Sequence, residues 1–313
     1  MGKRVFVFPG QGSQYVGMGA ELFRSEPEAA NVFRQAEQIL GYPLARLCFE
    51  GPPETLNKTG FTQPAVFTTS IAAFEVLKKH GISCDAVAGH SVGEYSALVA
   101  ADVLSFPDAL KIVQKRAQLM EKALLEKQGG MAAILGLERE AVEEICRQAR
   151  AKGVVQPANF NAPGQVVISG EKGGLEEAFV LARRAGAKKI IPLPVSGPFH
   201  SSFMEEAAQE LALYLEQFSF SPPRVLYVAN VNGSYVSNPA AIKSLLAEQV
   251  KSAVYWEESI KRLHLDGHRT FIEVGPGRVL SGLIKRIVSD ARTFHVEDRT
   301  SLEKVLAQLR GTV

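Results

Sequence analysis

The sequence predicts an α/β fold in which a mainly parallel sheet is covered by helices on both faces. Short apolar segments typical of buried strands alternate with helical segments along most of the 313 residues, without internal repeats or low-complexity linkers. A hydrophobic content of 46% and a charged content of 22% suit a globular chain with a substantial core. A second pattern, strand-helix-strand-strand-helix-strand, interrupts the first between residues 129 and 194. We therefore expect a large subdomain formed by residues 1–128 and 195–313, and a small inserted subdomain formed by residues 129–194.

Composition argues against several classes of function. The formal net charge of +2, without a lysine- or arginine-rich block, does not favour nucleic acid as a partner. No apolar run approaches the ~18 residues of a membrane span, so no membrane partner is expected. Cys48, Cys84 and Cys146 are widely spaced and form no C-x-x-C pair. This spacing argues against a disulfide framework and a zinc site, and it fits a reducing, cytoplasmic location with no bound metal.

The first strand is expected at Arg4–Phe8, and it leads into the glycine-rich loop Gly10–Gln14. Tyr15 stands where a dinucleotide fingerprint needs its third glycine, so the loop does not favour pyrophosphate binding. Loops at the carboxyl ends of strands are where α/β proteins place ligand-contacting groups. Gln11 is therefore a candidate hydrogen-bond donor, with ordinary turn formation as the alternative. Helices are predicted over residues 27–40 and 63–79.

Residues 84–101 carry the strongest functional signal. An apolar strand ends at the sequence GHSVG, residues 89–93, and helical sequence follows, which is the order of a nucleophile elbow. Glycines at both ends of the motif remove the Cβ atoms that would clash where strand and helix cross. The elbow would expose the hydroxyl of Ser91 above the sheet. It would also aim the N–H of Val92, at the helix N-terminus, at an oxyanion formed by attack of Ser91. An ordinary glycine turn is the alternative.

A helix is predicted from Ser105 to about Lys127, and Arg116 is the one charge on its apolar face, which also carries Met120. In one interpretation the arginine stem snorkels, so that the guanidinium reaches water or a glutamate. In the other, the guanidinium lies at the floor of a pocket and binds a carboxylate. The residues alone leave both interpretations open.

The inserted segment has the element order of a ferredoxin-like unit. Asn159 and Asn161 fall in the expected turn between its second and third strands. They either form the turn or line a cleft between the two subdomains. The predicted strands are 131–135, 154–158, 165–169 and 188–193, and the predicted helices are 138–151 and 175–185.

His200 follows Phe199 and stands just before a helix predicted over residues 203–218. The positive end of a helix dipole lowers the pKa of an imidazole, which favours the neutral form that a general base needs. His90 adjoins Ser91, and we expect its side chain to point elsewhere and to support the elbow.

The larger alternation of strands and helices resumes after residue 218. Asn238 is the expected cap of the first helix in this part of the chain. The predicted strands are 224–229, 270–274 and 294–296, and the predicted helices are 239–249, 255–265, 279–288 and 302–309.

The combination of several motifs resembles a known family. GQGSQ at residues 10–14, GHSVGE at 89–94, Arg116 and GPFH at 197–200 together resemble malonyl-CoA:acyl carrier protein transacylases, acyltransferases of bacterial type II fatty-acid synthesis. The segments 159–161 and 273–277, together with Gln249, extend the resemblance to essentially the whole chain. It implies an α/β-hydrolase-like parallel sheet core with an inserted ferredoxin-like subdomain, and an active site in the gorge between them.

The resemblance also implies roles for individual residues. Ser91 would be the nucleophile and His200 the base, with Gln249 in place of a triad acid, orienting His200 through its amide or its backbone carbonyl. Gln11 and the N–H of Val92 would form the oxyanion hole. The expected substrate-binding residues are Arg116 for the malonyl carboxylate, Phe199 as in malonyl-selecting members, and Asn159, Asn161, His90 and Met120.

The implied activity is transfer of a malonyl group from malonyl-CoA to the phosphopantetheine thiol of acyl carrier protein through a malonyl-serine intermediate, without a cofactor. A serine esterase or thioesterase and a non-catalytic acyl-binding module are the alternatives. The carrier would be acidic, and the enzyme a monomer. Candidate docking residues are the basic pairs Arg183-Arg184, Lys188-Lys189 and Lys285-Arg286.

Overall fold

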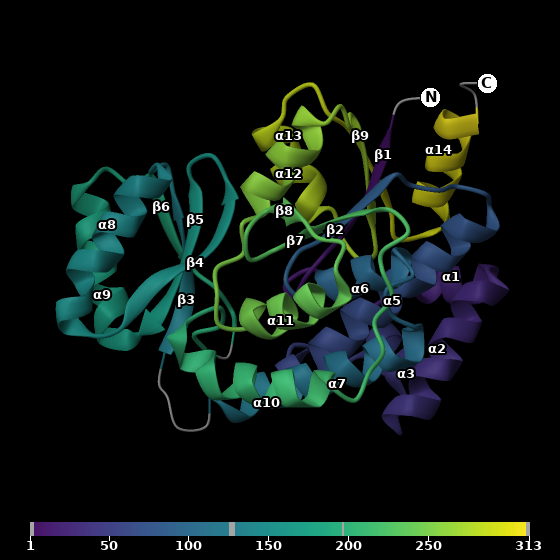
Figure 1. Cartoon of the computed structure of the whole chain (residues 1–313), viewed down its shortest axis with the longest axis horizontal. Helices are drawn as coiled ribbons and strands as arrows, with labels where there is room; N and C mark the ends of the chain where they lie inside the picture. Colours follow the sequence, from purple (N-terminus) through teal and green to yellow (C-terminus); the bar gives the residue numbers. More distant parts are fainter. Residues whose placement is uncertain (1–2, 125–128, 196, 311–313) are drawn as a thin grey trace.

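The computed structural model describes residues 3–124, 129–195 and 197–310. Figure 1 shows a large lobe built around one sheet and a smaller lobe, in teal, built around another. The large sheet has six strands in the order β10-β9-β1-β2-β7-β8, which are parallel except for the β7–β8 pair. These strands are β1 (Arg4–Phe8), β2 (Ala86–Gly89), β7 (Leu226–Ala229), β8 (Ser234–Tyr235), β9 (Thr270–Val274) and β10 (Arg292–Val296).

Alternating side chains of β1 supply two separate cores, because successive residues of a strand point to opposite faces of the sheet. Phe6 and Phe8 belong to a large buried cluster with residues of α2 (Pro27–Leu40), α5 (Thr59–Lys79) and α7 (Phe106–Lys122). Val5 and Val7 belong to a second cluster with residues of α12 (Trp256–Leu265) and α13 (Val279–Ile287). The sheet is thus covered on both faces, as expected. The remaining helices of this lobe are α1 (Ala20–Ser25), α3 (Leu44–Glu50), α4 (Pro53–Leu56), α6 (Gly93–Ala100), α10 (Glu205–Leu215), α11 (Pro239–Gln249) and α14 (Arg299–Arg310).

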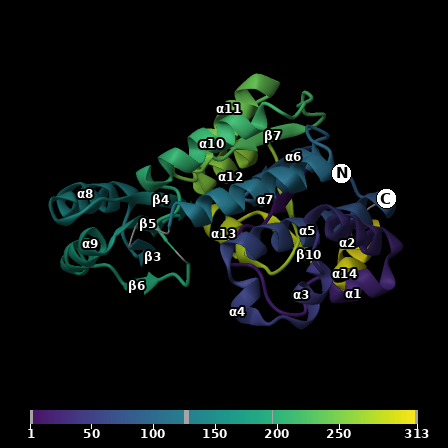
Figure 2. The ribbon, with the colours of Figure 1, turned by 90° about the horizontal axis from the view of Figure 1, so that it is seen from below.

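The small lobe contains an antiparallel sheet in the order β4-β5-β3-β6. Helices α8 (Arg139–Ala149) and α9 (Lys172–Arg184) pack against this sheet and against each other, and both lie at the outer end of the molecule (Figure 2). The element order along the chain is the predicted one. The strands are β3 (Gly129–Leu135), β4 (Val155–Ala162), β5 (Gln165–Glu171) and β6 (Lys189–Pro192).

Several helix boundaries differ from the prediction. Helix α5 begins at Thr59 rather than at Gln63, so Pro64 lies inside it instead of starting it. The first turn of α5 is already formed before the proline, because the N–H of Thr62 donates to the carbonyl of Lys58 at 2.8 Å. Helix α7 ends at Lys122, and the expected extension to Lys127 reaches residues 125–128, which lie outside the described part.

The expected helix over residues 203–218 is a short 3₁₀ turn, Ser202–Met204, followed by α10 from Glu205.

No helix in the described part of the chain combines the length and the apolar character needed to cross a membrane.

Candidate active site

Strand β2 passes into α6 through a very tight turn at Ser91, whose φ angle is 52°. A Cβ atom on Gly89 would lie 2.0 Å from the carbonyl oxygen of Gly93, and one on Gly93 would lie 2.2 Å from the carbonyl oxygen of Phe8. Both positions therefore require glycine, as the crossing of strand and helix predicts. Val92 is buried at the N-cap of α6, with its N–H at the positive end of that helix. The turn has the geometry of a nucleophile elbow.

Asn230, at the end of the neighbouring strand, holds this turn and was not predicted from the sequence. The backbone N–H of Ser91 donates to Asn230 Oδ1 at 2.8 Å, and Asn230 Nδ2 donates to the carbonyl of Gly89 at 2.6 Å. Asn230 directly follows β7, which pairs with β2. The sequence did contain a signal for this role, because Asn230 is a polar residue at the carboxyl end of a predicted strand of the same sheet.

His200 lies within hydrogen-bonding distance of the serine, with Nε2 2.7 Å from Ser91 Oγ. Its Nδ1 lies 2.8 Å from the backbone carbonyl of Gln249 and 3.2 Å from that of Ser252. Because carbonyl oxygens only accept hydrogen bonds, Nδ1 carries the proton and Nε2 accepts the hydroxyl proton of Ser91. Gln249 was expected to orient His200 through its side-chain amide or its backbone carbonyl, and in the structure the backbone carbonyl makes the contact.

Burial, and after it the nearby positive charge of Arg116, lowers the pKa of His200 to about 3. The expected cause was a helix dipole, whereas the main causes of the lowered pKa are burial and the charge of Arg116. A 3₁₀ turn, Ser202–Met204, lies between His200 and helix α10. The imidazole is nevertheless kept neutral, as a general base requires.

Arg116 is 1% exposed, so the interpretation in which its guanidinium reaches water is wrong. One terminal nitrogen, Nη1, donates to Gln63 Oε1 at 2.6 Å. The other, Nη2, donates to Gln249 Oε1 at 2.8 Å and to Ser91 Oγ at 3.1 Å. Its contacts are thus neutral oxygens, and burial without a direct anionic partner lowers its pKa. Gln63 was expected only to open a helix, and its contact with Arg116 comes from the packing of α5 against α7.

The serine, the histidine and most of the predicted substrate-binding residues line one cavity of about 80 Å³. Arg116 and Gln249 are buried behind its wall and reach it through their contacts with Ser91 and His200. The predicted residues in the lining are Gln11, His90, Ser91, Met120, Asn159, Phe199 and His200, and those not predicted are Gln63, Met131, Leu193 and Val195.

Asn159 and Asn161 lie in strand β4 and not in the expected turn. The β4–β5 pairing shifts register between Pro157 and Asn159 and again between Phe160 and Ala162, and such irregularities re-aim side chains. Asn161 Oδ1 lies 2.9 Å from His90 Nε2, so the small lobe contacts the elbow directly. The side chain of His90 therefore faces the cavity and the small lobe, which corrects the expectation that it points elsewhere. Asn159 lines the cavity.

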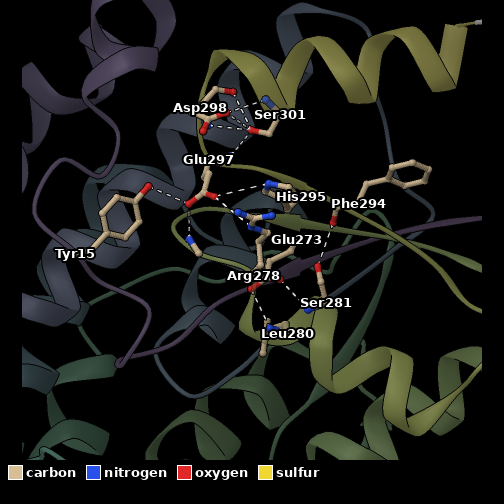
Figure 3. A network of polar contacts seen from close by, with 11 residues as sticks. Tyr15, Glu273, Arg278, Leu280, Ser281, Phe294, His295, Glu297, Asp298 and Ser301 are labelled. Atoms are coloured by element: carbon tan, nitrogen blue, oxygen red, sulfur yellow. Dashed lines mark hydrogen bonds and ion pairs between the residues drawn. The ribbon is translucent and has the colours of Figure 1, made fainter.

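Gln11 lines the cavity from the loop that follows β1, and its Nε2 donates to Thr59 Oγ1 at 3.2 Å. The far end of this loop is fixed by the polar network shown in Figure 3. Glu297 Oε2 accepts from the hydroxyl of Tyr15 at 2.9 Å and from the backbone N–H of Gly277 at 2.8 Å. One buried carboxylate after β10 thus ties the loops that follow β1 and β9 to each other.

Comparison with known proteins places this geometry in a family. Residues 5–305 match the family described as "Acyl transferase domain". The chain belongs to the acyl transferase family.

Several relatives of this acyl transferase carry more specific names. It is 46% identical over 311 residues to the malonyl CoA-acyl carrier protein transacylase of Bacillus subtilis, a match that covers 99% of this chain and 98% of the relative. It is 45% identical over 302 residues to the Escherichia coli K12 protein of the same name, with 96% and 98% covered. Among solved structures, the acyl carrier protein S-malonyltransferase of Vibrio cholerae superposes with a TM-score of 0.94 at 45% identity, with 97% and 99% covered. A malonyl-transacylase solved in complex with a type II polyketide acyl carrier protein superposes with a TM-score of 0.95 at 41% identity, with 98% and 99% covered.

Proposed function

We propose that this acyl transferase moves a malonyl group from malonyl-CoA to the phosphopantetheine thiol of acyl carrier protein through an ester on Ser91. One observation carries the proposal: Ser91 Oγ lies 2.7 Å from His200 Nε2 and 3.1 Å from Arg116 Nη2. A nucleophile beside a neutral base serves acyl transfer in general. A buried guanidinium beside the same oxygen adds selectivity for an acyl group that carries its own carboxylate.

In the first half-reaction, His200 Nε2 takes the hydroxyl proton as Ser91 Oγ attacks the thioester carbonyl of malonyl-CoA. The oxyanion of the tetrahedral intermediate is stabilised by Gln11 and by the N–H of Val92 at the start of α6. Collapse breaks the C–S bond, and the CoA sulfur leaves as a thiol with the proton held by His200. The product is a malonyl-serine ester.

The second half-reaction reverses these steps with another thiol. The phosphopantetheine thiol gives its proton to His200 and attacks the ester carbonyl, and Ser91 regains the proton as the C–O bond breaks. The carbonyl oxygens of Gln249 and Ser252 stabilise the imidazolium less than a carboxylate would. A thiol leaves readily and needs less acid assistance than an amine, so this weaker support is sufficient for thioester chemistry.

The pocket also accounts for the choice of acyl group. Arg116 has donors to offer a carboxylate, and Gln63 and Gln249 fix the plane of its guanidinium. Phe199 and Met120 are buried apolar residues of the lining, which limit the space to a short acyl chain. His90, Asn159 and Asn161 would contact the substrate from the side of the small lobe.

Several features support the wider assignment. The named relatives are malonyl transacylases, and one of the solved structures contains an acyl carrier protein. We propose an acidic carrier that docks on exposed basic residues near the junction of the lobes, where Arg286 Nη2 already donates to the carbonyl of Pro163 at 3.2 Å. A cytoplasmic location and a monomeric enzyme belong to the same proposal, as predictions from the sequence.

We further propose that residues 1–128 and 195–313 form an α/β-hydrolase-like subdomain and residues 129–194 a ferredoxin-like one. The separate sheets of the two lobes support this division, as does the βαββαβ order of the second.

Intact-protein and peptide mass spectrometry after incubation with malonyl-CoA tests the proposal. A malonyl adduct on Ser91 should form in the absence of carrier, disappear on addition of carrier protein bearing phosphopantetheine, and be missing in Ser91→Ala. Rapid release of free malonate without carrier would instead assign a thioesterase. The absence of any adduct would assign a binding module.

A further inference from the structure

Behind the pocket, the chain buries an acidic side chain that the proposed mechanism does not use. Glu94, in the first turn of α6, is 1% exposed. Its Oε1 accepts from the hydroxyl of Tyr227 and, at 3.1 Å, from the backbone N–H of Asn230. Its Oε2 accepts from Gln249 Nε2 at 2.5 Å. Three donors converge on this carboxyl group, which is the environment of a carboxylate that accepts hydrogen bonds.

The contacts of Gln249 determine which way its side-chain amide points. Its Oε1 accepts from Arg116 Nη2 at 2.8 Å, and a guanidinium can only donate. Its Nε2 therefore faces the other way, where it donates to Glu94 and, at 2.9 Å, to the carbonyl of Ser91. The backbone carbonyl of the same residue accepts from His200 Nδ1. Gln249 thus links Glu94 to the arginine, the serine and the histidine at once.

This arrangement also balances charge. Arg116 and Glu94 are both almost fully buried, and each lies in the electric field of the other. Burial raises the pKa of Glu94 to about 7, while the three donors and the charge of Arg116 act in the opposite direction. A carboxylate in direct contact with Arg116 would compete with the substrate for its donors. Because the Gln249 amide lies between them, the Glu94 carboxylate supplies a countercharge and leaves the donors of the guanidinium available to the substrate carboxylate.

We propose that Glu94 is a positioning residue that acts through the side chain of Gln249, setting the guanidinium of Arg116 for the malonyl carboxylate and steadying the carbonyl that orients His200. This inference rests on the proposed malonyl transfer and adds a determinant of acyl selectivity outside the pocket. Glu94 is not in the lining of the cavity, and its hydrogen-bond partners are Tyr227, Asn230 and Gln249 rather than Ser91 Oγ or the ring of His200.

The substitution Glu94→Gln tests the inference with little change in volume. An amide at this position places an N–H₂ group either against Gln249 Nε2 or against the N–H of Asn230. In the first case the Gln249 amide must reverse, which turns its N–H₂ group toward Arg116. We expect acylation of Ser91 by malonyl-CoA to slow on the order of 100-fold and acylation by acetyl-CoA on the order of tenfold, so that the malonyl-to-acetyl ratio falls about tenfold.

Two further variants keep the test decisive if Glu94→Gln folds poorly. Gln249→Met removes the amide but keeps the backbone carbonyl that faces His200, and it should lower the same ratio. In the double variant Glu94→Gln/Gln249→Met, the malonyl-to-acetyl ratio should be almost the same as in Gln249→Met alone, because the amide through which Glu94 acts is absent.

Glu273→Gln is the matched control. Glu273 is equally buried, burial likewise raises its pKa to about 7, and it accepts from the N–H groups of Leu280 and Ser281 at 3.0 and 2.7 Å, away from Gln249 (Figure 3). Glu273→Gln should lower the thermal stability and leave the malonyl-to-acetyl ratio unchanged.

The outcomes separate the inference from the function on which it rests. If the wild-type chain forms no malonyl adduct on Ser91, the proposed function fails. If the wild type forms the adduct but Glu94→Gln, or Gln249→Met, retains the wild-type malonyl-to-acetyl ratio, the function stands and the role of Glu94 is overturned. Equal slowing of Ser91 acylation by malonyl-CoA and by acetyl-CoA would also overturn the role of Glu94, because a less rigid turn at Ser91 alone would produce that result.

Discussion

The proposed nucleophile and its base share an uncommon backbone conformation. Ser91 and His200 have φ angles of 52° and 55°, in the left-handed region that non-glycine residues rarely occupy. Residues held in such conformations cluster at functional sites, where the surrounding structure fixes them. Here Asn230 holds the N–H of Ser91, and two backbone carbonyls hold the imidazole of His200. The two reacting side chains are therefore pre-positioned before any substrate arrives.

The depressed pKa of His200 gives a prediction at this scale. Because the pKa is lowered to about 3 by burial, the imidazole should stay neutral, with the proton on Nδ1, from pH 8 down to about pH 4.5. Protonation, and with it loss of the base, should set in only as the pH falls toward the folded-state pKa. Titration of the imidazole ¹⁵N resonances checks this directly. Protonation of His200 with a midpoint near 6.5 would contradict it.

Individual residues differ in how far the sequence could identify them. Ser91, His200, Arg116 and Gln11 were found because each stands in a motif or breaks an apolar pattern. The roles of Gln63 and Asn230 and the contact of the Gln249 side chain with Arg116 were missed, because these residues lie 53, 139 and 133 positions from Arg116, Ser91 and Arg116 in the chain. Only the packing of the strands and helices brings those donors and acceptors together.

At the scale of elements, the strand–helix crossing at the elbow limits what the chain tolerates. Gly89→Ala would place a Cβ atom 2.0 Å from the carbonyl oxygen of Gly93, which forces β2 and α6 apart. We expect a loss of roughly 3 kcal/mol or more in the free energy of unfolding, together with loss of Ser91 acylation. Urea denaturation and adduct formation measure the two effects.

Gly282→Ala is the control for that substitution. Gly282 lies inside α13 with open space around its Cβ direction, so alanine should stabilise the protein by about 0.5–1 kcal/mol through helix propensity. Wild-type stability and activity in Gly89→Ala would contradict the elbow geometry.

Strands and long helices with a clear hydrophobic pattern were predictable, and short helices were not. The helices at 27–40 and 239–249 and the strands at 4–8 and 270–274 have the predicted limits, because each combines a clear period with a capping or breaking residue. Helices α1, α3 and α4 have four to seven residues, too few to show a period, and were not predicted. The pair Asn159 and Asn161 resembles a turn in sequence. Pairing of β4 with β5 overrides that local preference and extends the strand to Ala162.

At the scale of the whole molecule, the site exists only where the two lobes meet. The backbones of β4 and the segment before α12 exchange hydrogen bonds, from the N–H of Phe160 to the carbonyl of Val254 and from the N–H of Val254 to the carbonyl of Ala158, both at 2.9 Å. Arg139 of α8 adds an ion pair with Glu258 of α12 at 2.5 Å and lies over the ring of Phe160 at 4.0 Å. These contacts hold Asn161 against His90, so the position of the small lobe sets the shape of the pocket.

Arg139→Ala should therefore weaken the junction. With the side chain 36% exposed, water screens the ion pair, so we expect a loss of about 1 kcal/mol in the free energy of unfolding and a severalfold slower acylation of Ser91. Arg147→Ala, on the same helix, removes only an exposed pair with Glu144 and should leave the stability almost unchanged. Equal effects of the two substitutions would show that Arg139 does not support the junction.

In the proposed mechanism, one buried guanidinium, beside a serine and its base, selects an acyl group that carries a carboxylate. The most direct test compares single-turnover acylation of Ser91 by malonyl-CoA and by acetyl-CoA in the wild type and in Arg116→Ala. Loss of a buried, charge-assisted contact worth about 2–4 kcal/mol should slow malonyl acylation by about 30- to 1,000-fold. Acetyl acylation, which does not use that contact, should fall much less or rise. An equal fall for both acyl groups would contradict the account and leave Arg116 with a purely structural role.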